Sequence, residues 1–272
     1  MLTRVLAWTF ALIHVLGLAL AAFGILVAVP HPSVWANGAG SAAFFAYALT
    51  HTGALSLVFA ALALTFYGAY AIGWPRTLIF AAVACIVSAA AELTGTATGW
   101  PFGGYEYTGL LGYKVGGRVP FSVPLSWYFM GFAAYLLAAA LVQKRTGKGG
   151  TLAAIALGAW LLTGWDLVLD PAMASPTLQY LRFWTWTEHG PYFGMPLRNL
   201  VGWYATGFAF IALARFLWRG DVTARRVPLA LPYAVYVANI VWAMALSASA
   251  GLWVSAVLAL LFTLLPATLA LL

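Results

Sequence analysis

Three acidic residues lie inside long apolar runs, where a purely structural membrane helix would carry none. The chain has six Asp and Glu among its 272 residues. Glu92 interrupts one apolar run, and Asp166 and Asp170 lie near the end of another, just before Pro171. A carboxyl group in lipid is costly unless it is paired, protonated or in contact with a wet cavity. These three residues are therefore the first candidates for chemistry.

The spacing of the two aspartates predicts a proton donor. Residues four apart share one face of a helix, and at 1.5 Å per residue Asp166 lies about 6 Å deeper than Asp170. Two close carboxylates in a low dielectric cannot both ionise cheaply, so one of them is expected to keep its proton near neutral pH. Pro171 is expected to end or kink the helix, which places Asp170 at a helix terminus. Glu92 is expected at a similar depth.

Each acid also has a structural interpretation. Asp170 could simply close its helix, and Glu92 could be a hydrogen-bond hub for Thr94 and Thr96. The remaining candidates, Glu106 and Glu188, could pair with cations in the loops, for which the sequence offers Lys114, Arg118, Arg182 and Arg198. His14 and His51 are lone histidines in two apolar runs, and each is expected to be buried with satisfied hydrogen bonds.

The composition indicates which elements position these residues. Hydrophobic residues make up 64% of the chain and charged residues only 7%, against roughly a quarter charged in a soluble domain. We therefore expect an all-α, polytopic membrane helix bundle in which residues 1–272 form a single integral-membrane domain. At about 20 residues per crossing, the apolar runs give about eight spans. They are expected at Val5–Val29, Ala42–Ile72, Thr77–Thr98, Pro124–Val142, Leu152–Asp170, Leu197–Leu217, Pro228–Ser247 and Leu252–Leu272.

The net charge is +7, and the placement of the basic residues predicts the orientation of the bundle. In a soluble protein it would suggest nucleic acid, but here the basic residues lie in short loops, so no nucleic-acid partner is expected. With eight spans, one side carries Arg4, Arg76, Lys144, Arg145, Lys148, Arg215, Arg219, Arg225 and Arg226. The positive-inside bias predicts a multi-pass cell-membrane protein with both termini in the cytoplasm.

The two longest connections, Gly99–Val123 and Ala172–Pro196, lie on the opposite side. They are rich in Gly, Pro, Tyr and Trp, unlike disordered linkers, which have few aromatic residues. We expect two aromatic-rich lid loops that pack over the bundle. No metal-ligand, nucleotide-binding or paired Asp-rich diphosphate motif occurs, so no cofactor and no metal are expected.

Acids that face an aromatic cavity suit the protonation of an alkene in a lipid-soluble substrate. The resulting tertiary cation is stabilised by aromatic faces, and a second carboxylate can orient water to capture it. A proton-coupled transporter would use the same acids, although the inverted repeats typical of many transporters are not apparent.

An ordered string of motifs distinguishes these alternatives. The segments at 92–108, 119–127, 166–171 and 192–203 resemble the integral-membrane carotenoid biosynthesis family, which contains the CruF-type carotenoid 1′,2′-hydratases and the bacterioruberin-type hydratases of archaea. The resemblance covers residues 92–203. It implies addition of water across the terminal ψ-end C=C of lycopene, γ-carotene or a C50 carotenoid, leaving a tertiary alcohol. Two alternatives stay open: a lycopene-cyclase-type isomerase, which protonates the same bond, and the proton-coupled transporter.

Under this hypothesis the catalytic residues are Glu92, Asp166 and Asp170. One aspartate protonates C2′ of the end group and Glu92 positions water at C1′, or the roles are reversed. Arg198 and Asn199 are expected to hold the carboxylates, and Glu106 and Glu188 are further candidates for substrate binding. The cation-stabilising wall and polyene channel are expected to consist of Tyr105, Tyr107, Trp127, Trp184, Trp186 and Trp203, each of which could instead be an interfacial anchor.

Overall fold

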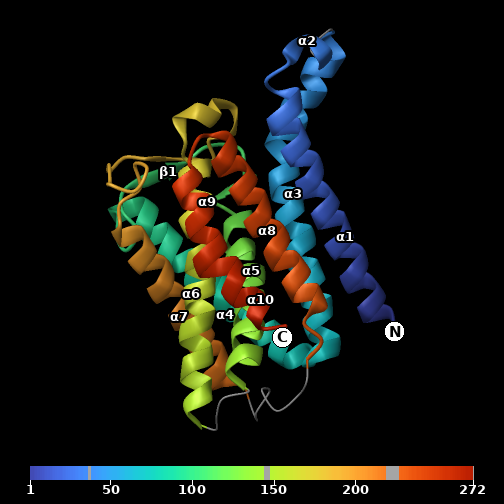
Figure 1. Cartoon of the computed structure of the whole chain (residues 1–272), viewed down its shortest axis with the longest axis vertical. Coiled ribbons are helices and arrows are strands. Elements are labelled where there is room, and N and C mark those ends of the chain that lie inside the picture. Colours follow the sequence, from blue (N-terminus) through green and yellow to red (C-terminus); the bar gives the residue numbers. More distant parts are fainter. Residues whose placement is uncertain (36–37, 144–147, 219–226, 272) are drawn as a thin grey trace.

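The chain folds as an all-α helix bundle (Figure 1), as the composition predicts. The structure is a computed structural model and describes residues 1–35, 38–143, 148–218 and 227–271. The long helices are α1 (Leu2–Phe23, continued by η1 Gly24–Ala28), α3 (Ala39–Ala71), α4 (Trp74–Thr98), α5 (Ser122–Gln143), α6 (Lys148–Met173), α7 (Arg198–Leu217) and α8 (Ala230–Ser249). Among the described residues, these seven are long and apolar enough to cross a membrane.

The apolar spans within these helices start and end within three residues of the runs expected from the sequence. The difference reaches three residues at Leu2, Trp74 and Met173, where Val5, Thr77 and Asp170 were expected. The eighth run differs. It forms a shorter apolar helix of α9 (Trp253–Ala259), η3 (Leu260–Leu264) and α10 (Leu265–Leu269), with a π-helical turn in its middle. This segment packs against α6 and α8, so the bundle has seven full-length spans and one shorter apolar segment.

Both termini lie toward the end of the bundle opposite β1 (Tyr105–Tyr107), as Figure 1 shows. This agrees with the expectation that both termini lie on the side of the bundle opposite the two long loops. Of the basic residues behind that expectation, Lys144, Arg145, Arg219, Arg225 and Arg226 lie outside the described part of the chain. Which compartment each end faces stays a prediction.

Helices α5 and α6 form the centre of the bundle, whereas α1 is mostly exposed on its outer face. The close packing depends on small residues, which let membrane helices approach each other. At Gly131 of α5, a Cβ atom would lie 2.4 Å from the ring of Phe210 on α7. A larger residue there would separate two helices that carry site residues.

The two aromatic-rich loops pack over the bundle, as expected, and they pair with each other. Strand β1 runs antiparallel to β4 (Trp184–Trp186), with Tyr105 opposite Trp186 and Tyr107 opposite Trp184. A second small ribbon joins β2 (Lys114–Val115) to β3 (Val119–Pro120), and the second loop also contains the short helix η2 (Pro176–Leu181). We call the β1–β4 pair the lid ribbon.

The sequence predicts that the helix ends or kinks at Pro171; it does not end there, because α6 continues to Met173. Proline has no N–H, so it cannot donate to the carbonyl four residues earlier, at Leu167. The Tyr192 hydroxyl, from the second loop, donates to that carbonyl at 3.0 Å instead. The Leu167 carbonyl therefore has a hydrogen-bond donor despite the proline. Asp170 lies inside the last turn of the helix.

Candidate active site

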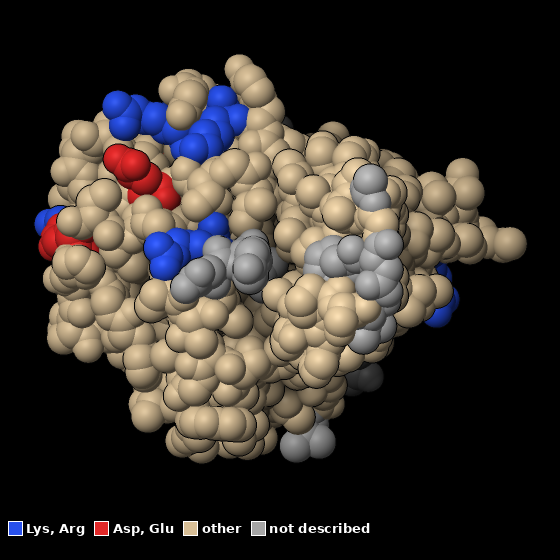
Figure 2. All heavy atoms as spheres, turned by 90° about the horizontal axis from the view of Figure 1, so that it is seen from above, with Lys and Arg blue, Asp and Glu red and all other residues tan. Residues whose placement is uncertain are grey.

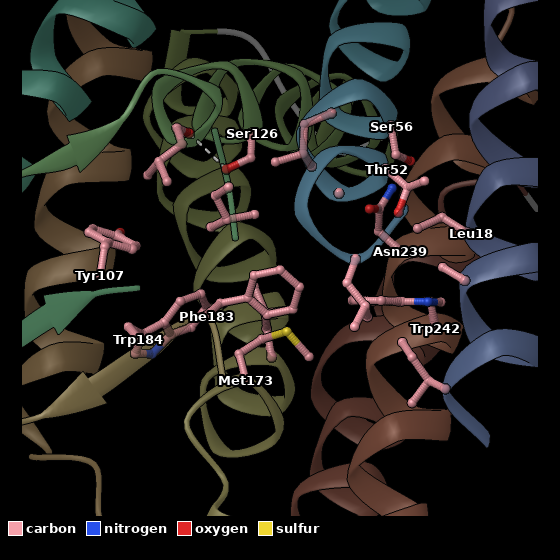
Figure 3. A pocket seen from close by; sticks show the side chains of 18 of the residues that line it. Leu18, Thr52, Ser56, Tyr107, Ser126, Met173, Phe183, Trp184, Asn239 and Trp242 are labelled. Carbon is pink, nitrogen blue, oxygen red and sulfur yellow. Dashed lines mark hydrogen bonds between the residues drawn. The ribbon is translucent and has the colours of Figure 1, made fainter. Parts of the chain in front are cut away.

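A cavity of about 560 Å³ lies beneath the lid ribbon and extends across the bundle toward α1 and α3. This volume is within the range of small-molecule sites, which are mostly apolar with a few fixed polar groups. Figure 3 shows Tyr107, Trp184 and Phe183 on one side of the cavity and Ser56, Asn239 and Trp242 on the other. Its lining includes two carboxyl groups, those of Glu92 and Asp170.

Glu92 is buried and held by three hydrogen-bond donors. The hydroxyls of Tyr105 and Tyr107 both donate to Oε2, the latter at 2.9 Å, and the indole N–H of Trp127 donates to Oε1 at 2.9 Å. Such donors offset the cost of burying a carboxylate, and within the described part of the chain no cation pairs with Glu92. Thr96 and Thr94 bond helix carbonyls instead, so the threonine hub considered for Glu92 does not form.

The alternation of β1 explains why two tyrosines reach one carboxylate. Side chains of a strand point to opposite faces in turn, so Tyr105 and Tyr107 point inward and Glu106 is exposed. Burial raises the pKa of both phenols well above the ordinary value, and the nearby carboxylate of Glu92 raises it further. Both hydroxyls therefore keep their protons and remain donors.

The two aspartates share a single donor group. The Asn199 amide nitrogen lies 2.8 Å from Oδ2 of Asp166 and 2.8 Å from Oδ2 of Asp170, and 3.1 Å from the sulfur of Met195. Asp170 lines the cavity, whereas Asp166 is fully buried behind it. Among the described residues, no cation pairs with either carboxyl and Oδ1 of Asp166 has no hydrogen-bond partner.

Aromatic rings form part of the wall of the cavity that Glu92 and Asp170 line. Trp127 stacks on Trp203 with ring centroids 3.8 Å apart, and Trp165 meets Trp203 edge-on at 5.9 Å. The lid ribbon adds its paired rings, with Tyr105 5.5 Å from Trp186 and Tyr107 5.9 Å from Trp184. All six aromatic residues expected in the wall line the cavity: Tyr105, Tyr107, Trp127, Trp184, Trp186 and Trp203.

Three expected substrate-binding residues lie outside the cavity. Glu106 faces outward, and Glu188 forms an ion pair with Arg198 in which the two side chains are 44% and 49% exposed. Arg198 therefore does not hold the aspartates, because neighbouring helix positions point about 100° apart and it is Asn199 that points inward. Seen from the lid end, most of the charged side chains in view gather over one side of the molecule (Figure 2).

Sequence reasoning missed several lining residues. Trp165 and Phe102 are buried in the cavity wall. Trp165 comes directly before Asp166 in the sequence, and this position is the signal that could have identified it. Ser56 and Asn239, on the far side of the cavity, had no such signal, because each is a lone polar residue in an apolar helix. His14 is buried and hydrogen-bonded, as expected. The same prediction was wrong for His51, which is exposed and hydrogen-bonds the Tyr47 carbonyl of its own helix.

Fold and site together define a polytopic helical membrane protein with an acid-bearing, tryptophan-lined cavity. The family model for carotenoid biosynthesis proteins matches residues 52–266, and the chain belongs to that family. The match extends beyond residues 92–203, where the motifs lie. No solved structure matches the chain.

A curated relative adds a narrower similarity. The chain is 33% identical over 125 residues to a bisanhydrobacterioruberin hydratase of Haloarcula japonica. The aligned part is 46% of this chain and spans 40% of the relative.

Proposed function

We propose that this protein is a carotenoid hydratase, a cofactor-independent hydro-lyase that adds water across the terminal ψ-end C=C of lycopene, γ-carotene or a C50 carotenoid. Family membership and the hydratase relative support the class of reaction. The observation that carries the proposal is that Glu92 and Asp170 line one apolar, aromatic cavity. In this proposal the substrate comes from the lipid of the cell membrane, and both termini are cytoplasmic.

Asp170 is the proton donor in this mechanism. It lines the cavity, whereas Asp166 lies behind it, and one amide serves both carboxyl groups. Because two adjacent buried carboxylates cannot both ionise cheaply, the pair holds one proton. That proton goes to C2′, the π electrons form the new C–H bond, and the positive charge appears at C1′.

The tryptophan wall stabilises this cation. Aromatic faces attract a desolvated cation by up to about 2 kcal/mol each. The rings of Trp127, Trp203 and Trp184 line the same cavity as Glu92 and Asp170, and a ring needs no bond to the reacting carbon in order to act. The wall also excludes bulk water, so that capture depends on a positioned molecule.

Glu92 positions that water. Its three donors stabilise a negative charge on the carboxylate, which suits a group that accepts a proton rather than one that supplies it. The water oxygen attacks C1′ and its proton passes to Glu92, so the elements of H₂O are added in total. Proton exchange with water then restores Glu92 and the aspartate pair. For these reasons the reversed assignment of the two roles is the weaker one.

The test is expression in a bacterium that accumulates lycopene, with chromatography and mass spectrometry of the extracted pigments. A more polar pigment that is heavier by one or two waters, with an unchanged chromophore, is the expected result. An isomer of unchanged mass would instead identify a cyclase. If both lycopene and γ-carotene stay unaltered beside well-expressed protein, the proposal fails for these substrates, and a C50 carotenoid is the remaining test. Proton-dependent movement of an unchanged substrate would identify a transporter.

A further inference from the structure

The cavity has a second polar side, across from the lid ribbon. Ser56 of α3 and Asn239 of α8 line it there, and Figure 3 shows both across the cavity from Tyr107 and Trp184. Asn239 is 3% exposed, so its amide meets the cavity rather than open lipid. The mechanism above uses neither residue.

His14 fixes the orientation of both polar groups. Its Nδ1 lies 3.0 Å from the Ser56 backbone carbonyl and 2.8 Å from the Ser56 hydroxyl oxygen. A carbonyl can only accept, so the proton is on Nδ1 and Nε2 is an acceptor. Nε2 then receives the Asn239 amide N–H at 2.9 Å, and the other N–H of that amide goes to the Val235 carbonyl at 2.8 Å.

This network leaves one donor and one acceptor unused. The Ser56 hydroxyl accepts from His14, so its own proton is free. Both N–H groups of Asn239 are engaged, and among the described residues no hydrogen bond reaches its Oδ1. The Val235 carbonyl excludes the flipped amide, which would bring two oxygens together. A buried amide oxygen without a partner costs free energy, so an occupant of the cavity that donates to it is favoured.

We propose that Ser56 and Asn239 form a binding site for a hydroxyl group of the substrate, so that the protein prefers a carotenoid that already carries an alcohol. This proposal rests on the proposed function for the kind of molecule bound. An alcohol accepts from Ser56 and donates to Asn239, which satisfies both groups. A hydrocarbon leaves both unpaired, and a ketone leaves Asn239 unpaired.

Ser56→Ala is the informative variant, because it removes the free donor while the Ser56 backbone carbonyl still accepts from His14. Thr52→Val is the matched control. Thr52 lines the same side of the cavity, one helical turn away, but its hydroxyl already donates to the Ala48 carbonyl at 2.7 Å.

The experiment measures binding of carotenoids to the full chain in lipid nanodiscs by quenching of tryptophan fluorescence. The probes are an acyclic carotene and a set of its monohydroxylated derivatives that differ in the position of the hydroxyl group. We expect at least one derivative to bind about tenfold more tightly than the carotene, the effect of one buried hydrogen bond. In Ser56→Ala this preference should largely disappear while the affinity for the carotene is unchanged, and Thr52→Val should keep it.

Three results would overturn the proposal. The carotene binds as tightly as every derivative, as it would if only water occupied the polar side. The preference survives in Ser56→Ala. Ser56→Ala weakens the binding of the carotene as much as the binding of the alcohol, which would indicate a purely structural role for Ser56. The proposed function fails separately, when the expected binding pattern is present but no water is added to any bound carotenoid.

Discussion

Replacing Asp170 with Asn removes the carboxyl of the aspartate pair that faces the cavity and keeps the shape of the side chain. The introduced amide can still accept from Asn199 through its oxygen, as Oδ2 of Asp170 does at 2.8 Å. The helix, the wall and the three donors on Glu92 are untouched. What is lost is the proton that the mechanism transfers to C2′.

A general acid contributes about 10²–10⁴-fold to a reaction rate, which corresponds to about 3–5 kcal/mol in the activation barrier. We expect Asp170→Asn to lower kcat/KM by that factor. Hydrated pigment formed per minute is measured by chromatography in membranes that contain matched amounts of folded protein, judged by thermal unfolding of the purified variants.

The matched control is Asp166→Asn, the same change one helical turn deeper at a side chain that does not line the cavity. It removes the group that shares the proton, and we expect a loss of about tenfold, the size of one charge-assisted hydrogen bond. Activity of Asp170→Asn within threefold of wild type would refute its role as the donor. A larger loss in Asp166→Asn than in Asp170→Asn would transfer that role to Asp166.

Three further predictions concern the surroundings of the acids. Tyr107→Phe removes one of three donors to Glu92 and should lower kcat/KM by about 5–100-fold, so an unchanged rate would show that the donor does not matter. Because the pKa of Tyr105 and Tyr107 is raised in the fold, their contribution to stability should be complete below about pH 10 and be lost as the pH rises through the folded-state value. Absorbance at 295 nm should therefore show these two phenols ionising only as the protein unfolds, and an earlier step from them would contradict the burial argument. Glu188→Gln breaks an exposed ion pair with Arg198. It should change the free energy of unfolding by less than about 1 kcal/mol, measured by thermal unfolding, and the hydration rate by less than twofold, measured by the pigment assay. A large loss of activity would instead place that pair in the reaction.

The spans could be predicted because the bilayer imposes one simple requirement, a long apolar run. The last run shows the limit of that reasoning, because composition says that Leu252–Leu272 is apolar but not that its helix is Trp253–Leu269 with a π turn. The acids could be predicted as site candidates because a carboxyl group in lipid is costly unless it is paired, protonated or in contact with a wet cavity. The partner of a carboxyl could not, because Arg198 and Asn199 are both plausible donors and helix phase alone selected the amide.

The pairing of the two loops was also beyond sequence reasoning. Tyr-Glu-Tyr and Trp-Thr-Trp each alternate as a strand does, but three residues are too few to indicate a strand, and the two segments lie 79 residues apart from Tyr105 to Trp184. Long-range pairing of short segments depends on the bundle that brings them together. The polar side of the cavity at Ser56 and Asn239 could not be predicted for a related reason. His14, Ser56 and Asn239 come from three different helices, which only the folded bundle brings together.

The lid ribbon has a consequence for anyone who recombines members of this family. Each loop supplies one strand, and the second loop is also fastened to the aspartate-bearing helix by Tyr192 at the Leu167 carbonyl. A chimera that takes the first loop from one parent and the second from another would set mismatched rings opposite each other and displace the tyrosines from Glu92. The natural unit of exchange is therefore both loops together with the end of α6, and crossover points belong at the opposite end of the bundle.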